Sequence, residues 1–295
     1  RGSLAEDTRP GARSLLQKYE KKVRALEKES ARAEKLWAYE REAARAGAKR
    51  PAGLDEAGRG PLVGAVVAAA VVLPEGWACA GLNESKKLTP EKRDKLFETI
   101  TREALAFGVG EASAAEIDAL NIYRATQAAM GRAVAALLAP PDFLLTDAMP
   151  LPEIRLPQKP IVQGDALSAS IAAASIVAKV TRDRQMAELD KRYPGYGFAS
   201  HKGYGTEEHL KALDELGPCP EHRVSFGPVA KAVVGRSTAG PAAYWQGRLE
   251  AAKNGEELRQ VGHQIKRLGA ADLKPAELGF LREAYRKKSA SWGGE

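Results

Sequence analysis

The sequence of 295 residues lacks most features that mark secreted or membrane proteins. It has only two cysteines, Cys79 and Cys219, and neither has a second cysteine or a metal-type spacing near it, which argues against a disulfide framework and a zinc site. Its longest apolar run, Ala65–Leu73, is far shorter than the roughly 20 residues that span a bilayer. No charged segment followed by an apolar one stands at its start. We therefore expect a soluble, cytoplasmic protein.

Histidine is also scarce, and no combination of residue types suggests a side-chain nucleophile. The four histidines are scattered, and none belongs to a Ser-His-Asp or Cys-His arrangement. A lone histidine more often caps a helix or packs in a core than binds a metal. We expect such roles for His201, His209, His222 and His263.

The net charge of +7 is distributed unevenly along the chain. Residues 1–50 carry +6 and residues 236–295 carry +4, which leaves −3 on the segment between them. A mildly acidic centre with basic flanks suits a protein that has a carboxylate-rich site and holds a polyanion with its surroundings. Charged helices also serve solubility alone, so charge by itself leaves both interpretations open.

Residues 1–50 form the first predicted unit, a basic helical N-terminal extension. From about Ser14 to Ala46 the chain lacks glycine and proline, and apolar or small residues recur at spacings of three and four from Leu16 to Trp37. This heptad-like stripe predicts one long helix that ends before Gly47. Such a helix can pair with another helix, pack on the body of the protein or lie along nucleic acid, and the sequence leaves these outcomes open.

Residues 51–235 form the second predicted unit, in which strands and helices alternate as in α/β domains. The Val- and Ala-rich run Leu62–Leu73 predicts a buried strand, and Thr89-Pro90 predicts the start of a helix with threonine as its cap. The other expected elements are helices over 90–103, 114–138 and 168–192 and strands over 107–112, 143–146 and 161–162.

Residues 236–295 form the third predicted unit, a helical C-terminal extension. A polar hinge at residues 236–241 separates it from the preceding unit. Apolar stripes over Leu258–Leu268 and Leu278–Tyr285 predict two or three short helices that form a small bundle or dock on the main domain.

The segment Gly53–Gly64 is the most informative part of the sequence. Two adjacent carboxylates, Asp55 and Glu56, lead into the turn Gly58-Arg59-Gly60. Neighbouring side chains on a strand point to opposite faces, and glycines let backbone amides approach a ligand closely. A divalent cation on the carboxylates and a phosphate held by the amides and Arg59 would use every part of this segment.

Two more carboxylates follow predicted strands. Asp147 ends the apolar run that begins at Phe143, and Asp165 comes just after Ile161-Val162 and before a helix. Ligands of α/β sheets gather outside strand ends, so both can converge with Asp55 and Glu56. Taken alone, Asp147 fits a turn and Asp165 fits a helix cap. Four carboxylates together need divalent cations, and a set of oxygen ligands favours Mg²⁺ or Mn²⁺.

Several short motifs occur in an order that resembles bacterial ribonuclease HII, a type 2 ribonuclease H. They are Gly53–Leu62, Leu82–Leu88, Gly164–Arg184, His201–Thr206 and Gly217–Arg223. The resemblance extends over roughly residues 51–230 and does not reach the two extensions. It implies a ribonuclease H-like fold, that is, a mixed sheet flanked by helices. It also implies endonucleolytic cleavage of RNA in RNA–DNA hybrids or at ribonucleotides embedded in duplex DNA.

The resemblance also implies roles for individual residues. Asp55, Glu56, Asp147 and Asp165 match the catalytic, metal-binding carboxylates of the family. The turn Gly58-Arg59-Gly60 matches the element that senses the ribose 2′-hydroxyl, and Tyr204 matches a tyrosine that packs on the sugar. Four residues fall in segments that touch backbone phosphates: Lys86, Ser175, Lys179 and Arg184. The sequence departs from the family at Glu84, where aspartate is more usual, which puts the local loop geometry in doubt.

These residue types suit hydrolysis of a phosphodiester by two divalent cations, Mg²⁺ or Mn²⁺, that activate water and neutralise the leaving oxygen. We expect incision on the 5′ side of a ribonucleotide, leaving 5′-phosphate and 3′-hydroxyl ends, by a monomer whose extensions remain available for a protein partner. The alternative is a non-catalytic nucleic-acid-binding protein, which has no reason to retain four mutually repelling carboxylates. A third candidate, ribonuclease HIII, is disfavoured by the Gly58-Arg59-Gly60 turn and by the absence of a strand-rich N-terminal segment.

Overall fold

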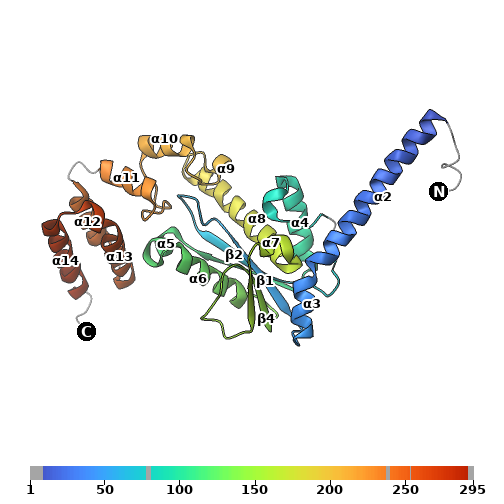
Figure 1. Ribbon diagram of the computed structural model, residues 1–295. Helices are drawn as coiled ribbons and strands as arrows, with labels where there is room; N and C mark the ends of the chain where they lie inside the picture. Colours follow the sequence, from blue (N-terminus) through green and yellow to red (C-terminus); the bar gives the residue numbers. More distant parts are fainter. Residues whose placement is uncertain (1–8, 78–80, 237–239, 253, 292–295) are drawn as a thin grey trace.

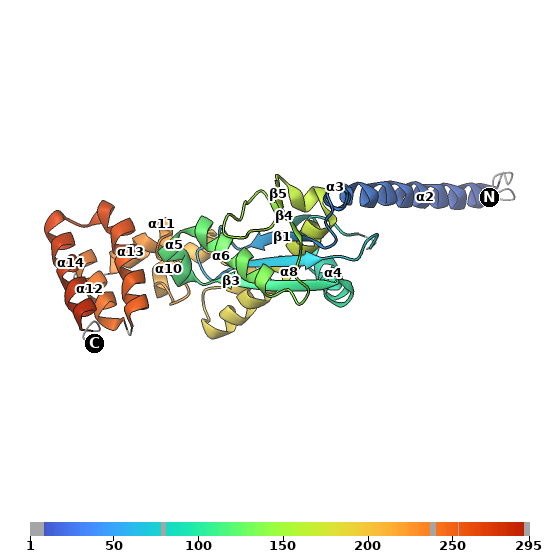
Figure 2. The same ribbon diagram turned by 90° about the horizontal axis from the view of Figure 1, so that it is seen from below.

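The computed structural model describes residues 9–77, 81–236, 240–252 and 254–291. A sheet with helices on both faces lies at the centre of an elongated molecule (Figure 1). An N-terminal helix projects from one end, and a group of C-terminal helices lies at the other (Figure 2). In the described part of the chain, no helix is both long and apolar enough to cross a membrane.

The sheet has five strands in the order β3-β2-β1-β4-β5 and is mixed, as the sequence predicted. Strand β1 is antiparallel to β2 and parallel to β4, β2 is antiparallel to β3, and β4 is parallel to β5. The strand bounds are β1 Pro51–Ala57, β2 Val66–Val72, β3 Ala106–Ala112, β4 Phe143–Asp147 and β5 Gln158–Ile161.

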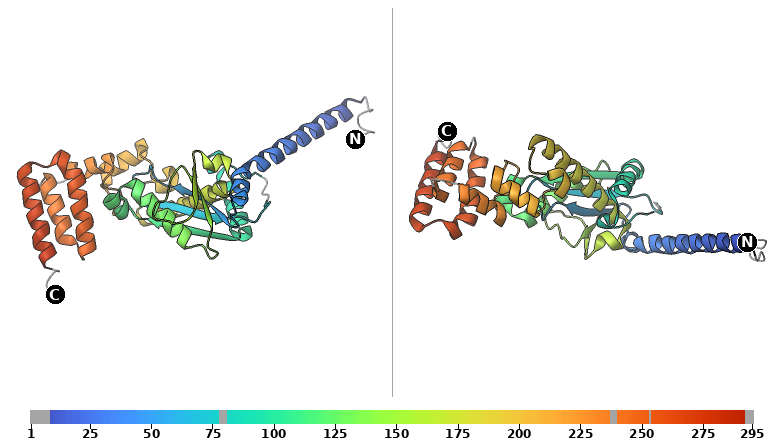
Figure 3. Two further views of the ribbon diagram at one scale, coloured as in Figure 1. Left: turned by 60° about the horizontal axis from the view of Figure 1, so that its bottom comes forward. Right: turned by 90° about the horizontal axis from the view of Figure 1, so that it is seen from above.

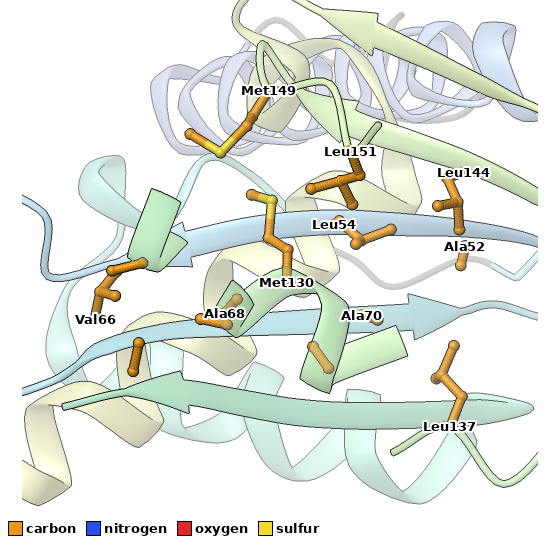
Figure 4. Packing of buried hydrophobic residues seen from close by; sticks show 14 of the residues in the cluster. Ala52, Leu54, Val66, Ala68, Ala70, Met130, Leu137, Leu144, Met149 and Leu151 are labelled. Carbon is orange, nitrogen blue, oxygen red and sulfur yellow. The ribbon is translucent and has the colours of Figure 1, made fainter. Parts of the chain in front are cut away.

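Helices cover both faces of the sheet, which is why β2 is buried along its whole length. Helix α8, Ala169–Arg192, packs on β1 and β2, while α6, Ile122–Ala135, packs on β2 and β3 from the other side. Figure 4 shows the core on the α6 side, where Leu54 of β1 faces Met130 of α6 and Leu151. This packing fixes β1 as the central strand, and β1 carries the two adjacent carboxylates.

Most expected elements are present, and the differences have local causes. Helix α4, Pro90–Glu103, begins and ends where predicted. The segment expected as one helix over 114–138 is two helices, α5 Ala114–Leu120 and α6, because Asn121 adopts a positive φ of 78° between them. The strand expected from Leu62 begins at Val66, because the amide of Leu62 donates to the carbonyl of Gly203 instead of to a strand.

Five short helices complete the central part, one after β2, one after β5 and three after α8. Their bounds are η1 Ser85–Lys87, α7 Gly164–Leu167, α9 Phe198–His201, α10 Glu207–Leu216 and α11 Gly227–Arg236. Helix α7 joins β5 to α8 through the single residue Ser168, which ends one helix and caps the next.

The N-terminal extension is two helices rather than the one expected, α2 Pro10–Leu36 and α3 Ala38–Arg45. They divide at Trp37, whose indole donates to the carbonyl of Trp77 at 3.1 Å. Most of α2 projects away from the body, as both views of Figure 3 show. Its end and α3 pack on the body, where Leu36 is 4% and Ala43 is 2% exposed.

The C-terminal extension forms three helices, α12 Gly240–Ala251, α13 Gly255–Asp272 and α14 Pro275–Ala290. Its apolar side chains, among them Trp245 and Leu258, share one cluster with Leu62 and Leu213 of the central part. The predicted hinge includes residues 237–239, which lie outside the described residues. The domain boundaries at residues 50 and 235 stay predictions.

Candidate active site

Four acidic residues lie at one edge of the sheet, where its parallel strands end. Strands β1 and β4 are parallel neighbours, and their register brings Asp55 beside Asp147, the last residue of β4. Strand β5 is parallel to β4, and the chain passes from it into α7, which carries Asp165. Together with Glu56, the four carboxylates that the sequence singled out lie at this edge, which we call the carboxylate edge.

Asp55 is buried and repelled by its neighbours. It is 5% exposed, and its carboxylate accepts hydrogen bonds from the Ser175 hydroxyl and, at 2.7 Å, from the amide of Glu56. Burial first, and then the negative charge of Glu56, raise the pKa of Asp55 well above its ordinary value, and the charge of Asp147 adds to this. A carboxylate in this environment is stabilised by a nearby cation.

Glu56 and Asp165 are in a similar electrostatic environment. Burial raises the pKa of Glu56, while a hydrogen bond from Arg59 at 3.0 Å opposes the rise. Burial and the charges of Asp147 and Glu84 raise the pKa of Asp165. Since the charge of Asp147 raises the pKa of all three other carboxylates, the four act as one electrostatic unit.

The side-chain atoms available as metal ligands at this edge are of the type that hard divalent cations prefer. All are oxygens, and Oε2 of Glu56 is buried with no hydrogen-bond partner in the described structure. Among the described residues, however, no three acidic, histidine or cysteine side chains are arranged to hold one ion as they stand.

A fully buried arginine, Arg223, holds the glycine-rich turn by its backbone carbonyls. Arg223 is 0% exposed, and its guanidinium donates to four backbone carbonyls of the turn region. The acceptors are Gly58 at 2.6 Å, Pro61 at 2.7 Å, Gly64 at 2.9 Å and Arg59 at 3.0 Å. The planar fork of donors suits this task, because one side chain satisfies several carbonyls at fixed angles.

A second buried arginine supports the same turn. Arg182 of α8 is 2% exposed and donates to the carbonyls of Val63 and Ala65, both at 2.8 Å. Gly58 has a φ of +93°, and a Cβ atom there would lie 2.5 Å from Nε of Arg182. Glycine is required at this position both by the backbone conformation and by the contact with the arginine.

The orientation of the carbonyls determines where the amides of the turn point. In a planar trans peptide the N–H points opposite to the C=O. Because the carbonyls of Gly58 and Arg59 point toward Arg223, the amides of Arg59 and Gly60 point away from it. Neither amide donates to an acceptor in the described part of the chain. The turn therefore offers two backbone donors, and the side chain of its Arg59 is bonded to Glu56.

Tyr204 lies against this turn. Its side chain is 50% exposed, and a Cβ atom built on Gly60 would lie 3.3 Å from the edge of its ring. Its backbone carbonyl is bonded to Nδ1 of His209 at 2.9 Å. The ring is thus a surface group on a fixed backbone, as a platform for a sugar requires, and the exposure does not suit a core tyrosine.

The expected phosphate-binding residues are divided between two places. Lys86 is exposed on η1, and its charge opposes the rise in the pKa values of Glu56 and Asp165, which places it near the carboxylate edge. Ser175 is also there, but it is buried and bonded to Asp55 and to Ser85 at 2.9 Å. These bonds favour a role in holding Asp55 over a direct phosphate contact.

Lys179 and Arg184 lie further along α8. Lys179 is paired with Asp183 at 2.5 Å, and Arg184 is paired with Asp94 at 3.2 Å and lies over the ring of Phe97. Both cations are thus occupied by neighbouring carboxylates. Contact with a phosphate would require these pairs to exchange partners.

Glu84 adds a further negative charge to the site. The residue is paired with Lys87 at 2.7 Å, and its charge raises the pKa of Asp165. The departure from the usual aspartate therefore lies directly beside the carboxylate edge, rather than in a remote part of the loop.

Comparison with known proteins assigns the chain to a family. A family model described as ribonuclease HII matches residues 52–229, which is more than half of the chain. The chain belongs to the ribonuclease HII family. A second model, the ribonuclease HII N-terminal domain, matches residues 2–44. The expectation that the resemblance does not reach the N-terminal extension is therefore wrong.

Relatives and solved structures agree with this assignment. Ribonuclease HII of Geobacillus kaustophilus is 56% identical over 226 residues, which are 77% of this chain and 86% of that protein. The crystal structure of ribonuclease H2 from Pyrococcus horikoshii has a TM-score of 0.53 at 25% identity and covers 62% of this chain and 96% of that one. A structure of Bst-RNase HIII in complex with Mn²⁺ has a TM-score of 0.52 at 17% identity, covering 64% and 70% of the two chains, and shows the fold alone.

Family membership gives the general activity. The protein is a metal-dependent ribonuclease H, an endonuclease of the hydrolase class, and the mixed sheet with flanking helices is its ribonuclease H-like fold. In this chain the carboxylate edge is joined to the glycine turn through Arg59 and Glu56, and Tyr204 lies against the same turn.

The residues that hold the Gly58-Arg59-Gly60 turn in place were not apparent from the sequence. Arg182 and Arg223 belong to matching motifs, but nothing in the sequence distinguishes a buried arginine from the more common exposed one. The role of Asp118 of α5 was not apparent either. Its carboxylate accepts from the amides of Val224 at 2.9 Å and Ser225 at 2.7 Å and so fixes the segment after Arg223. No sequence pattern links Asp118 to a segment more than 100 residues away.

The buried histidines of this chain have packing roles. His209 and His222 are buried with their Nε2 atoms 3.1 Å apart, and Nδ1 of His222 accepts from the amide of Cys219 at 3.0 Å. Cys219 is a buried free cysteine, while Cys79 lies outside the described residues. This cluster supports the loop that carries Tyr204.

Proposed function

We propose that the protein hydrolyses the RNA strand of RNA–DNA hybrids and incises duplex DNA on the 5′ side of an embedded ribonucleotide, leaving 5′-phosphate and 3′-hydroxyl ends. One observation carries the proposal: the carbonyls of Gly58 and Arg59 accept from Arg223, so the amides of Arg59 and Gly60 point away from it, in the turn whose Arg59 side chain donates to Glu56 of the carboxylate edge at 3.0 Å. A group that distinguishes RNA from DNA can read only the 2′-hydroxyl, and these amides are free donors for it.

Asp55, Glu56, Asp147 and Asp165 are the residues proposed to hold two divalent cations, Mg²⁺ or Mn²⁺. When bound, such ions supply an activated water and neutralise the leaving oxygen. Ser175 keeps Asp55 oriented by its hydrogen bond, and the backbone amide of Gly164 does the same for Asp147 at 2.8 Å. Oε2 of Glu56 is buried and has no hydrogen-bond partner in the described structure that a cation would have to displace.

The remaining residues are proposed to place the substrate. The Tyr204 ring supports the sugar next to the turn, and Lys86 contacts a phosphate near the carboxylates, while Lys179 and Arg184 hold the backbone further away. The partners are RNA–DNA hybrids and ribonucleotide-containing duplex DNA, bound by a monomer in the cytoplasm. The non-catalytic alternative is disfavoured, because carboxylates that raise one another's pKa destabilise a fold that makes no use of them.

A cleavage assay on a labelled duplex with one ribonucleotide tests this function. We expect a single cut on the 5′ side of the ribonucleotide with Mg²⁺ or Mn²⁺, and no cut in chelator. The matched control is the same duplex with deoxyribose at that position, which should stay intact. Equal cutting of the all-DNA duplex, or full activity in chelator, would contradict the proposal.

Tyr204→Ala should reduce the rate at a single embedded ribonucleotide by roughly 10 to 100-fold, because loss of the platform misplaces the reacting sugar. Affinity for a hybrid should change less. Since the ring is 50% exposed, the melting temperature should remain near that of the wild type. Tyr204→Phe keeps the ring and is the control. A large loss of melting temperature, with activity that follows the folded fraction, would assign Tyr204 to the core instead.

A further inference from the structure

A buried acidic side chain from the N-terminal extension lies at the start of α8. Glu40 of α3 is only 4% exposed. Its Oε1 atom accepts three hydrogen bonds, from the Ser168 hydroxyl at 2.5 Å, the Ser170 hydroxyl at 2.7 Å and the Ser170 amide at 2.9 Å. Its Oε2 atom is buried with no hydrogen-bond partner in the described structure. A contact that served packing alone would not need a charged group here.

The bonds from Glu40 satisfy a backbone amide at the start of α8 that the helix's own cap residue, Ser168, does not reach. The first amides of a helix have no partner within the helix, and a negative charge at this end is favoured by the helix dipole. Ser168 caps the amide of Ile171 at 3.2 Å, and Glu40 takes the amide of Ser170. The N-terminal extension therefore completes the start of a 24-residue helix of the central part.

The capped residues connect directly to the carboxylate edge. Ser168 ends α7, and its amide donates to the carbonyl of Gly164 at 2.8 Å, so the turn that carries Asp165 leads straight into it. Seven residues later on α8, Ser175 donates to Asp55. A shift at the start of α8 therefore moves two groups of the edge at once.

The start of α8 also packs closely against β1, which leaves Ser170 little freedom to move toward that strand. A Cβ atom built on Gly53 would lie 2.1 Å from the carbonyl carbon of Ser170, so strand and helix touch backbone to backbone two residues before Asp55. The spacing between β1 and α8 is thus set by direct contact, and the Glu40 bonds act on the same residue, Ser170.

We propose that Glu40 is a positioning residue for the carboxylate edge, through which the N-terminal extension sets the placement of Asp165 and Ser175. The inference rests on the metal role proposed above for the carboxylates. It assigns to α3 a function in the chemistry of the central part, in addition to any contact that the basic α2 makes with nucleic acid.

The test uses the full chain and Mn²⁺ as the probe. Glu40→Ala should weaken Mn²⁺ binding, measured by calorimetry, roughly 10-fold, and should lower kcat on the single-ribonucleotide duplex by a similar factor. KM for the duplex should stay within about twofold, because the substrate platform is untouched. Glu40→Gln keeps an oxygen acceptor of the same reach and should restore most of both quantities.

Two controls separate positioning from stability. Glu42→Ala removes an exposed carboxylate of the same helix, paired with Lys159, and should leave both quantities unchanged. Leu36→Ala removes buried packing of the extension but keeps the cap, so it should lower the melting temperature and leave Mn²⁺ affinity unchanged. If Glu40→Ala behaves like Leu36→Ala, the positioning role is refuted.

Two further outcomes are decisive. If Glu40→Ala does not fold, Ser170→Ala removes one of the three bonds to the carboxylate and must show a smaller loss in the same two quantities, or the inference fails. If the wild-type protein itself neither binds Mn²⁺ nor cleaves, the proposed function fails. If the wild type does both and Glu40→Ala matches it, only the inference about Glu40 fails.

Discussion

Asp55→Asn should reduce turnover by at least roughly 10³-fold, because a divalent-ion site supplies several kcal/mol of transition-state stabilisation and the substitution removes one of the charges that hold it. The substitution keeps the shape of the side chain and an acceptor for Ser175, so the fold should be retained. Single-turnover cleavage at saturating Mn²⁺ measures the effect. A rate near that of the wild type would show that Asp55 is structural.

The same variant should be more stable than the wild type in chelator at neutral pH. The pKa of Asp55 is raised in the folded state, so the folded protein binds more protons than the unfolded one between the two pKa values. The stability that Asp55 contributes in this way is fully present below the ordinary aspartate pKa. It is lost as the pH rises through the pKa that Asp55 has in the folded protein. At pH 7 the metal-free wild-type protein is therefore destabilised by repulsion between Asp55 and the neighbouring carboxylates, whereas Asp55→Asn is not.

Melting in chelator at pH 7 and near pH 4 checks the sign. The stability advantage of Asp55→Asn should shrink toward the lower pH, where the wild-type carboxyl is protonated. Asp142 is the matched control: burial pushes its pKa up, but the amides of Arg50 and Lys49 outweigh this and lower it. Asp142→Asn should therefore destabilise the protein at pH 7. If Asp55→Asn is less stable than the wild type at both pH values, the repulsion argument is wrong.

Local signals predicted the elements that depend on local chemistry. The Thr89-Pro90 start placed α4 to the residue, because a capping side chain and a preset proline act within one turn. The end of β4 at Asp147 and the position of Asp165 between a strand and a helix were also visible, since an apolar run followed by a carboxylate is a short pattern. Family motifs then supplied the fold, which composition and periodicity gave only as an α/β sheet.

The sequence could not predict the features that depend on hydrogen-bond partners far along the chain. Trp37 divides the N-terminal helix through a bond to Trp77, and a heptad-like stripe contains no information about that contact. Glu40 reads as one more charge on a charged helix, although its partners lie about 130 residues away. Arg223 appears in the sequence only as the last residue of a motif, and nothing there shows that it is fully buried and donates to carbonyls.

Arg223→Lys should cause the largest loss of stability among single substitutions around the turn. A lysine ammonium is a point charge with three donors and cannot reach four carbonyls at the angles of a guanidinium. Leaving buried acceptors unpaired costs ~1–3 kcal/mol each, so a loss of about 4 kcal/mol is expected, equivalent to roughly 8–16 °C in melting temperature for a domain of this size. Thermal melting by circular dichroism measures it.

Two neighbouring arginines provide graded controls. Arg182→Lys should lose less, because Arg182 serves two carbonyls rather than four. Arg192→Ala removes an exposed pair with Glu221 at 3.5 Å, close in space to the same segment, and should change stability by no more than about 0.5 kcal/mol. A melting temperature of Arg223→Lys equal to that of Arg192→Ala would show that the four carbonyl bonds do not stabilise the turn.

The effect on function should exceed the effect on stability. Because Arg223 orients the carbonyls of Gly58 and Arg59, its loss frees the opposed amides to rotate away from the 2′-hydroxyl. At a temperature where the variant is fully folded, kcat/KM for the single-ribonucleotide duplex should fall by roughly 100-fold, the expected result of removing a preoriented donor, while metal affinity stays unchanged. Weakened Mn²⁺ binding would instead mean that the turn and the carboxylate edge move together, and unchanged kcat/KM would mean that the amides do not depend on Arg223.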